Sequence, residues 1–243
     1  MSVVDSIFDR LSQWRYLPDY QLERRADIFF ACYLPDILKN RNHIIQETII
    51  PEFPMRKGTL GLTPENLSFK IDYLAVTKDL TKVFFIELKT EMKSISENQC
   101  INMVKAASKD IGIKKLIDGI LTLFKETREK RKYYRLLQMI EQLGLIKIPA
   151  SVQEIMDRKR LNGINRLLRN KDVMNINEWY IAKDLQNYEI CYILPRNSKK
   201  LSAIDPTIKQ ITFRDFIEVA SIKNDEFSRR FVLALEQWAL RGA

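Results

Sequence analysis

One short segment of the chain carries two carboxylates and a lysine whose spacing could support hydrolytic chemistry. Asp72, Glu87 and Lys89 lie within residues 69–91, which read as two strands joined by a turn at residues 78–81. In a hairpin centred on that turn, Asp72 lies opposite Glu87, and opposed residues have Cβ atoms about 4.5–5.5 Å apart. Like charges repel at that distance, so the register predicts a cation between the two carboxylates.

A divalent metal is the cation that such a pair would suit. Mg²⁺ and Mn²⁺ favour oxygen ligands, and Mg²⁺ is typically held by one or two carboxylates together with water and substrate phosphate. Lys89 lies two residues after Glu87 and therefore projects from the same face of the strand. There its ammonium group could hold a metal-bound water or stabilise charge on a phosphoryl oxygen.

A structural interpretation of the same residues stays open. Alternation gives the hairpin one apolar face that suits a core, made of Ile71, Tyr73, Ala75, Phe84, Ile86 and Leu88. The other face has Asp72, Glu87, Lys89 and Glu91, with Leu74 and Phe85 nearer the turn. Half-exposed antiparallel strands often carry a solvated polar face, on which Lys89 would pair with Glu87 or Glu91. Alternation alone does not choose between a metal site and a solvated face.

A long helix is expected before the hairpin. Asp19 is a plausible N-cap, and apolar residues then recur at helical spacing: Ala26, Phe29, Phe30, Tyr33, Leu34, Ile37 and Leu38. Pro35 should kink or split this helix, because an interior proline costs about 3 kcal/mol. Residues 44–50 read as a strand that ends at Pro51, and the prolines and glycines of residues 51–66 predict a loop.

After the hairpin the pattern becomes mostly helical over residues 96–175, and strands follow at residues 179–182 and 188–194. Two more helices are expected, one from Phe213 and one after Asn224. This order predicts a single α/β domain over residues 1–243, with a central mixed sheet flanked by helices. We expect its core to be residues 19–100 and 176–243, and residues 101–175 to be a basic helical insertion.

Composition excludes several classes of site. The 7 glycines form no GxGxxG or P-loop motif, and the single histidine, His43, excludes a multi-histidine metal site. The 3 cysteines are too scattered for a zinc site and suit a reducing compartment, so we expect a cytoplasmic protein. No apolar run approaches the length of about 18 residues that a membrane span needs. Any metal ligands must therefore be carboxylates and backbone oxygens.

The arrangement of the hairpin residues resembles the PD-(D/E)xK nuclease superfamily, whose core is the restriction-endonuclease-like fold. The matching residues are Ile71-Asp72, followed after the turn by an apolar run and Glu87-Leu88-Lys89. The resemblance implies that Asp72, Glu87 and the backbone carbonyl of Leu88 bind Mg²⁺, and that Lys89 assists the attacking water. Ile71 stands where the classical motif has proline.

Two accessory positions fit the same resemblance. Many members supply an acidic residue from the first helix, where this chain has Glu23, with Asp27 as the substitute one turn later. Glu23 could equally be a first-turn glutamate that the helix dipole favours. Exonuclease-like members place a glutamine after the Glu-x-Lys strand, where Gln99 stands, although most glutamines on a helix surface are only solvated. Glu52 is a further candidate ligand.

The positive charge is concentrated in the predicted insertion. The chain has a net charge of +9, and residues 101–175 hold 17 Lys and Arg against 8 Asp and Glu, which leaves the remainder neutral. Such residues would contact a nucleic-acid backbone through salt-dependent phosphate contacts, whereas the alternative is a solvated basic helix. Tyr133 and Tyr134 could stack on bases or anchor their helix. The candidate nucleic-acid-binding residues are Arg128, Arg131, Lys132, Arg135, Arg158 and Arg160.

We therefore expect a metal-dependent nuclease, a hydrolase that cleaves phosphodiester bonds in nucleic acid with a metal-activated water, with DNA favoured over RNA. The alternative is a catalytically silent nucleic-acid-binding or protein-interaction module on the same fold. The sequence leaves open endo- versus exonuclease action, sequence preference and the oligomeric state, a homodimer included.

Overall fold

A five-stranded mixed sheet in the order β1-β2-β3-β6-β7 forms the centre of the molecule. The computed structural model describes residues 2–17, 21–158, 179–181 and 184–241. The first three strands are antiparallel neighbours, β6 runs parallel to β3, and β7 runs parallel to β6. Their bounds are β1 Ile50–Arg56, β2 Ser68–Val76, β3 Val83–Leu88, β6 Tyr188–Leu194 and β7 Lys209–Thr212. Two short strands, β4 (Ile146–Lys147) and β5 (Tyr180–Ile181), pair separately.

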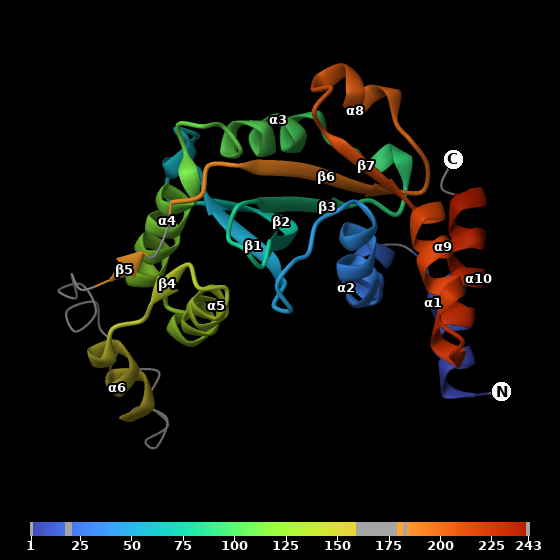
Figure 1. The fold of residues 1–243 in the computed structure, drawn as a ribbon, viewed down its shortest axis with the longest axis horizontal. Helices are drawn as coiled ribbons and strands as arrows, with labels where there is room; N and C mark the ends of the chain where they lie inside the picture. Colours follow the sequence, from blue (N-terminus) through green and yellow to red (C-terminus); the bar gives the residue numbers. More distant parts are fainter. Residues whose placement is uncertain (1, 18–20, 159–178, 182–183, 242–243) are drawn as a thin grey trace.

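Helices cover both faces of the sheet and produce two hydrophobic cores. The helices of the first core are α3 (Glu97–Ala106), α4 (Gly112–Glu126), α5 (Lys130–Gln142), α6 (Ala150–Arg158) and α8 (Lys199–Ile204). The helices of the second core are α1 (Val3–Trp14), α2 (Leu22–Asn40), α9 (Phe213–Ile222) and α10 (Glu226–Arg241). Figure 1 shows α4, α5 and α6 at one end of the sheet and α1, α9 and α10 at the other. The predicted α/β class, with a mixed sheet flanked by helices, is confirmed.

The described part of the predicted insertion packs directly on the sheet. Ile113, Ile117 and Ile120 of α4 lie in the same core as Ile50 and Phe53 of β1. Residues 101–158 therefore share the hydrophobic core of the sheet, and the remaining part of the predicted insertion, residues 159–175, lies outside the described residues.

The hairpin has the register that its turn predicts. Tyr73 pairs with Ile86, and Leu74 pairs with Phe85. Near the turn, however, both faces of the hairpin are buried. Leu74 and Phe85, on the predicted polar face, lie in the first core, and Tyr73 and Ile86, on the other face, lie in the second. Ile71 also lies in the first core, not with Tyr73 as alternation suggests. β3 has a parallel neighbour, and strands of that kind are usually buried on both faces.

The strand predicted at residues 44–50 is wrong in position. Only Ile45 forms a bridge there, with Thr77, and the true strand β1 begins at Ile50 and contains Pro51 and Pro54. β1 is the edge of the sheet, so its prolines need not donate hydrogen bonds to a second neighbour. The two prolines that predicted a loop are therefore tolerated inside a strand.

The helix before the hairpin starts later and is more continuous than predicted. α2 begins at Leu22 with Gln21 as its N-cap, and Asp19 lies outside the described residues. Pro35 does not split the helix, which continues to Asn40. Buried residues on both sides of the proline, such as Tyr33 and Ile37, keep both halves packed against the second core. Among the helices described, none is long and apolar enough to cross a membrane.

Candidate metal centre

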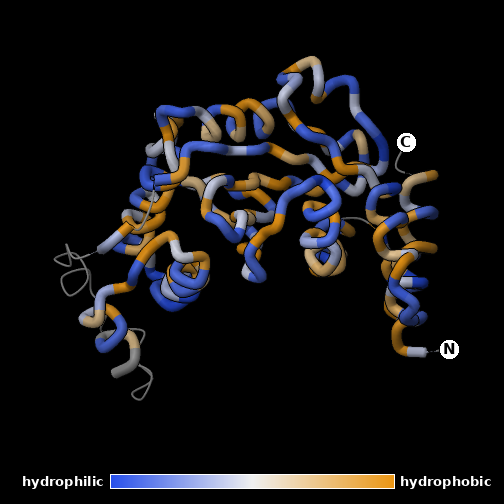
Figure 2. The backbone as a smooth tube through the Cα atoms, in the orientation of Figure 1, coloured by the Kyte–Doolittle hydropathy of each residue, from blue (hydrophilic) through white to orange (hydrophobic). Residues whose placement is uncertain are grey.

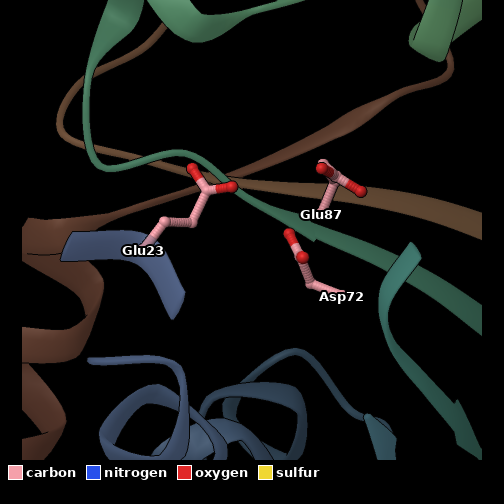
Figure 3. A group of neighbouring side chains, drawn as sticks. All are labelled: Glu23, Asp72 and Glu87. Carbon is pink, nitrogen blue, oxygen red and sulfur yellow. The ribbon is translucent and has the colours of Figure 1, made fainter. Parts of the chain in front are cut away.

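Three carboxylates from three different elements meet at one end of the hairpin. Glu23 lies in the first turn of α2, Asp72 in β2 and Glu87 in β3. One oxygen of each lies within 4.8 Å of the others. Figure 3 shows the three side chains pointing toward one another, with Glu23 reaching in from the start of the helix. Within the described residues this is the one acidic group that could hold a metal ion.

The end of the β2–β3 ladder places Asp72. The last pair of this ladder is Tyr73 with Ile86, so Asp72 lies one step beyond it, toward Glu87. There the Leu88 N–H donates to Asp72 Oδ2 at 2.6 Å. A side-chain oxygen thus accepts the backbone hydrogen bond of β3, which holds the carboxylate against that strand. This contact also brings the Leu88 backbone to the cluster.

Lys89 connects two of the acids. Its Nζ donates to Glu87 Oε1 at 2.6 Å and to Glu23 Oε1 at 3.3 Å. Its backbone N–H donates to the Ile193 carbonyl of β6 at 2.9 Å, which fixes the lysine at the end of the sheet. Lys89 is 6% exposed and Glu87 is 1% exposed. The solvated-face interpretation is therefore wrong, although the ion pair it proposed between Lys89 and Glu87 is present.

Gln99 reaches the same carboxylate from α3. Its Nε2 donates to Glu87 Oε1 at 2.6 Å, and its backbone N–H donates to Ser96, the N-cap of the helix. Gln99 is thus more than a solvated surface residue. Glu87 Oε1 receives two donors, whereas the buried Oε2 has no hydrogen-bond partner among the described residues.

Burial alters the protonation of the whole cluster. Desolvation raises the pKa of Glu87 to about 8, and the nearby charge of Asp72 adds to this effect. Desolvation also raises the pKa values of Asp72 and Glu23. Burial lowers the pKa of Lys89, but the charges of Glu87 and Glu23 outweigh it, so the pKa lies above its usual value. Such a group of carboxylates is suited to a divalent cation, which favours their ionised forms.

The two substitute ligands lie outside the cluster. Glu52 forms an ion pair with Lys70 at 2.8 Å on the outer side of the sheet edge. Asp27 accepts a hydrogen bond from the Ile28 N–H through its side chain, and its carbonyl accepts one from the Tyr73 hydroxyl. Glu23, not Asp27, is the acid that α2 supplies.

A pocket of about 380 Å³ opens beside Glu23, and sequence reasoning missed it. Arg15 at the end of α1, Arg24 of α2 and Thr90 after β3 line it. Arg15 has no sequence signal that connects it to the hairpin, because only the packing of α1 and α2 brings it there.

Two of the predicted nucleic-acid-binding residues, Lys132 and Arg135, line a pocket with Glu52 and Lys70 at the edge of the sheet. Arg128, Arg131, Lys132 and Arg135 are exposed on α5 and just before it, where Figure 2 shows much of the helix in the hydrophilic colour. Tyr134 is buried and anchors α5 in the first core. Arg158 is the last residue of α6, and Arg160 lies outside the described residues.

Comparisons with protein-family models, with curated proteins and with solved structures found no match to this chain. The function is therefore argued from the chemistry of the site.

Proposed function

We propose that this protein is a metal-dependent nuclease of the PD-(D/E)xK type, built on a restriction-endonuclease-like core, that hydrolyses phosphodiester bonds in nucleic acid, with DNA favoured over RNA. The observation that carries the proposal is the buried Oε2 of Glu87, which has no hydrogen-bond partner in the described part of the chain and lies in a group of three carboxylates, two of them paired with Lys89. A buried carboxylate oxygen without a donor costs free energy, and a cation beside it removes that cost.

The residues present fit Mg²⁺ or Mn²⁺. Asp72, Glu87 and Glu23 would supply carboxylate oxygens, and Leu88 would add its backbone carbonyl; this donor set is the all-oxygen kind that these ions prefer. When bound, the ion would supply Lewis-acid activation of water and neutralisation of phosphate charge.

The protein's own side chains have distinct tasks in this proposal. Lys89 presents an ammonium group that can hold the attacking water or stabilise the phosphoryl oxygen. Gln99 fixes the orientation of Glu87 through its hydrogen bond to Oε1. The basic face of α5 would contact the nucleic-acid backbone without reading sequence. The three free cysteines support a reducing compartment, the cytoplasm, as the place of action.

The alternative is a nucleic-acid-binding or protein-interaction module without catalysis. One observation favours it: Lys89 already contributes a positive charge to Glu87 and Glu23. In that case the protein binds DNA in a salt-dependent manner and takes up no metal in calorimetry.

The test is cleavage of linear, nicked, branched and single-stranded nucleic acid with Mg²⁺ or Mn²⁺. Asp72→Asn should lower the rate by about 10²-fold or more, because it removes a charged ligand without changing the size of the side chain. Glu218→Gln is the control, since Glu218 is an exposed carboxylate of α9 outside the cluster, and it should leave the rate unchanged. Cleavage that persists in Asp72→Asn rules out the proposed site.

A further inference from the structure

Another pocket lies between α5 and β1, at the edge of the sheet, and the metal centre does not account for it. Its volume is about 360 Å³. Three residues of β1 and three of α5 form the apolar part of its lining: Ile50, Pro51, Pro54, Tyr133, Leu136 and Met139. These six residues are called the edge pocket below.

The edge pocket is apolar and yet open to the outside. Tyr133, Leu136 and Met139 pack against the first core but remain half-buried, so part of each side chain faces the pocket. Pro51 and Pro54 have no backbone N–H, which disfavours the addition of another strand along this part of β1. Such a surface suits a flat ring better than an extended peptide.

Charged side chains surround the apolar lining, three of them cations and two carboxylates. Lys70 pairs with Glu52 at 2.8 Å. Lys132 pairs with Glu129 at 3.0 Å. Arg135 donates to the neutral amide of the glutamine three residues later at 2.9 Å, and it forms no ion pair with the residues that the structure describes. One exposed guanidinium is therefore available to an anion at the rim, where its planar donors match phosphate oxygens.

We propose that the edge pocket binds one unstacked nucleobase of the nucleic-acid strand, with the ring of Tyr133 as the stacking platform and Arg135 at the adjoining phosphate, an inference that rests on the proposed nuclease function. An aromatic ring stacks on any base, because every base has a π-face. A volume of about 360 Å³ is at the small end of ligand pockets, which span about 300–1,000 Å³, and suits a single base rather than a duplex.

The edge pocket adjoins the carboxylate cluster. Glu52 belongs to its lining, and the residues on both sides of Glu52 in β1 pair with the residues on both sides of Asp72 in β2. Desolvation is the main cause of the raised pKa of Asp72, and the charge of Glu52 adds to it, as expected for neighbouring side chains. A nucleotide whose base lies in the edge pocket is therefore close to the phosphodiester at the cluster.

Three variants separate stacking from a structural role. Tyr133→Ala removes the ring, and Tyr133→Phe keeps the ring without its hydroxyl. Tyr180→Ala is the matched control, because Tyr180 is 62% exposed in β5 and does not line the pocket. Thermal denaturation checks the fold of all three, and sedimentation checks their oligomeric state.

The experiment measures the binding of fluorescent single-stranded trinucleotides by anisotropy in Ca²⁺, with one complete probe and others that lack the base at a single position. Tyr133→Ala should weaken binding of the complete probe by about 5-fold or more, as loss of one stacked base does. Tyr180→Ala should change it less than about 2-fold. Wild type and Tyr133→Phe should lose affinity for one abasic probe, to which Tyr133→Ala should be indifferent.

Wild type alone can overturn the inference, if it binds every abasic probe as tightly as the complete one. Equal effects of Tyr133→Ala and Tyr180→Ala would also overturn it, as would an abasic penalty that is the same in wild type and Tyr133→Ala. An oligomer that dissociates in Tyr133→Ala would assign the pocket to a second copy of the chain and overturn the inference as well.

Cleavage with Mg²⁺ is measured in parallel, so that the two proposals can fail separately. Wild type that cleaves but binds abasic and complete probes equally overturns the edge pocket alone. Binding that depends on one base and on Tyr133, without cleavage, overturns the nuclease proposal alone.

Discussion

Glu87 is the residue on which the site depends. It is almost completely buried, it takes hydrogen bonds from Lys89 and Gln99 on one oxygen, and its other oxygen has no donor among the described residues. Three carboxylates share one ammonium group, so the cluster carries excess negative charge in a place that water barely reaches. The folded protein tolerates this arrangement better when a proton or a metal ion is present.

The stability of the metal-free protein should therefore fall as the pH rises. The pKa of Glu87 is raised from 4.5 to about 8 in the folded state, so its protonated form favours folding. This contribution is complete below about pH 4.5 and is lost as the pH rises through about 8. Glu87→Gln removes the titrating group and should flatten the curve. Urea denaturation between pH 5 and about 8.5 in the presence of a chelator measures the difference.

Glu218→Gln should follow wild type in that series, because Glu218 lies in an exposed ion pair with Arg214 outside the cluster. Parallel curves for wild type and Glu87→Gln would contradict the assignment of the raised pKa to Glu87.

Metal affinity should also depend on the protonation of Glu87. A divalent ion must displace the proton that Glu87 holds at neutral pH, so Mg²⁺ or Mn²⁺ affinity should increase from pH 6 to about pH 8. Calorimetry in two buffers of different ionisation enthalpy should detect about one proton released per ion at pH 7. Asp72→Asn should abolish the binding heat, and a heat that does not depend on the buffer would exclude proton displacement.

At the scale of elements, the hairpin shows what local sequence can predict. The turn sets the register, so the proximity of Asp72 and Glu87 follows from residues within one segment. β1 was misplaced because Pro51 and Pro54 predict a loop, and only the position of the strand at the sheet edge makes them acceptable.

Contacts between distant segments could not be derived from local pattern. The sequence of α2 alone fits a helix-dipole role for Glu23 as well as a ligand role, since nothing in it indicates that its first turn meets β2 and β3. The sequence around Arg15 contains no motif that indicates the pocket beside Glu23. Arg15 reaches the pocket only because α1 packs against α2.

The exposed face of α5 is an element whose role can be tested separately. Reversing Arg131, Lys132 and Arg135 to Glu should weaken DNA binding by about 10-fold or more and reduce the slope of log K against log salt by up to about 3. Anisotropy titrations at several salt concentrations measure both quantities.

The control for this experiment has the same change of charge elsewhere. Lys199 of α8, Lys209 of β7 and Arg214 of α9 are exposed and can be reversed in the same way. Figure 1 shows these elements at the other end of the sheet from α5. Equal losses in the two triple variants would indicate a general effect of net charge and no specific contact by α5.

At the scale of the whole molecule, aromatic packing holds α2 in place over the sheet. Phe30 lies 5.3 Å from Phe213 and 5.0 Å from Phe216 of α9, and 5.4 Å from Phe231 of α10, measured between ring centres. Tyr33 stacks on Phe231 at 5.2 Å. The carboxylate of Glu23 therefore depends on helices from the other half of the chain.

Phe231→Ala should destabilise the protein by about 3–5 kcal/mol, because the side chain is fully buried and its removal leaves a cavity. Denaturant unfolding measures the change. Leu233→Ala, on the exposed side of the same helix, should cost less than about 1 kcal/mol and serves as the control. Similar losses in both variants would show that α10 does not clamp α2 through Phe231.

The aromatic packing of α2 against α9 and α10 also sets the order in which the site forms during synthesis. The hairpin with Asp72, Glu87 and Lys89 leaves the ribosome while α9 and α10, which hold α2 against the sheet, are still to be made. A growing chain can therefore form the hairpin early, but it can hold Glu23 beside it only after α10 has emerged. Assembly of the three carboxylates is thus delayed until translation of these helices is complete.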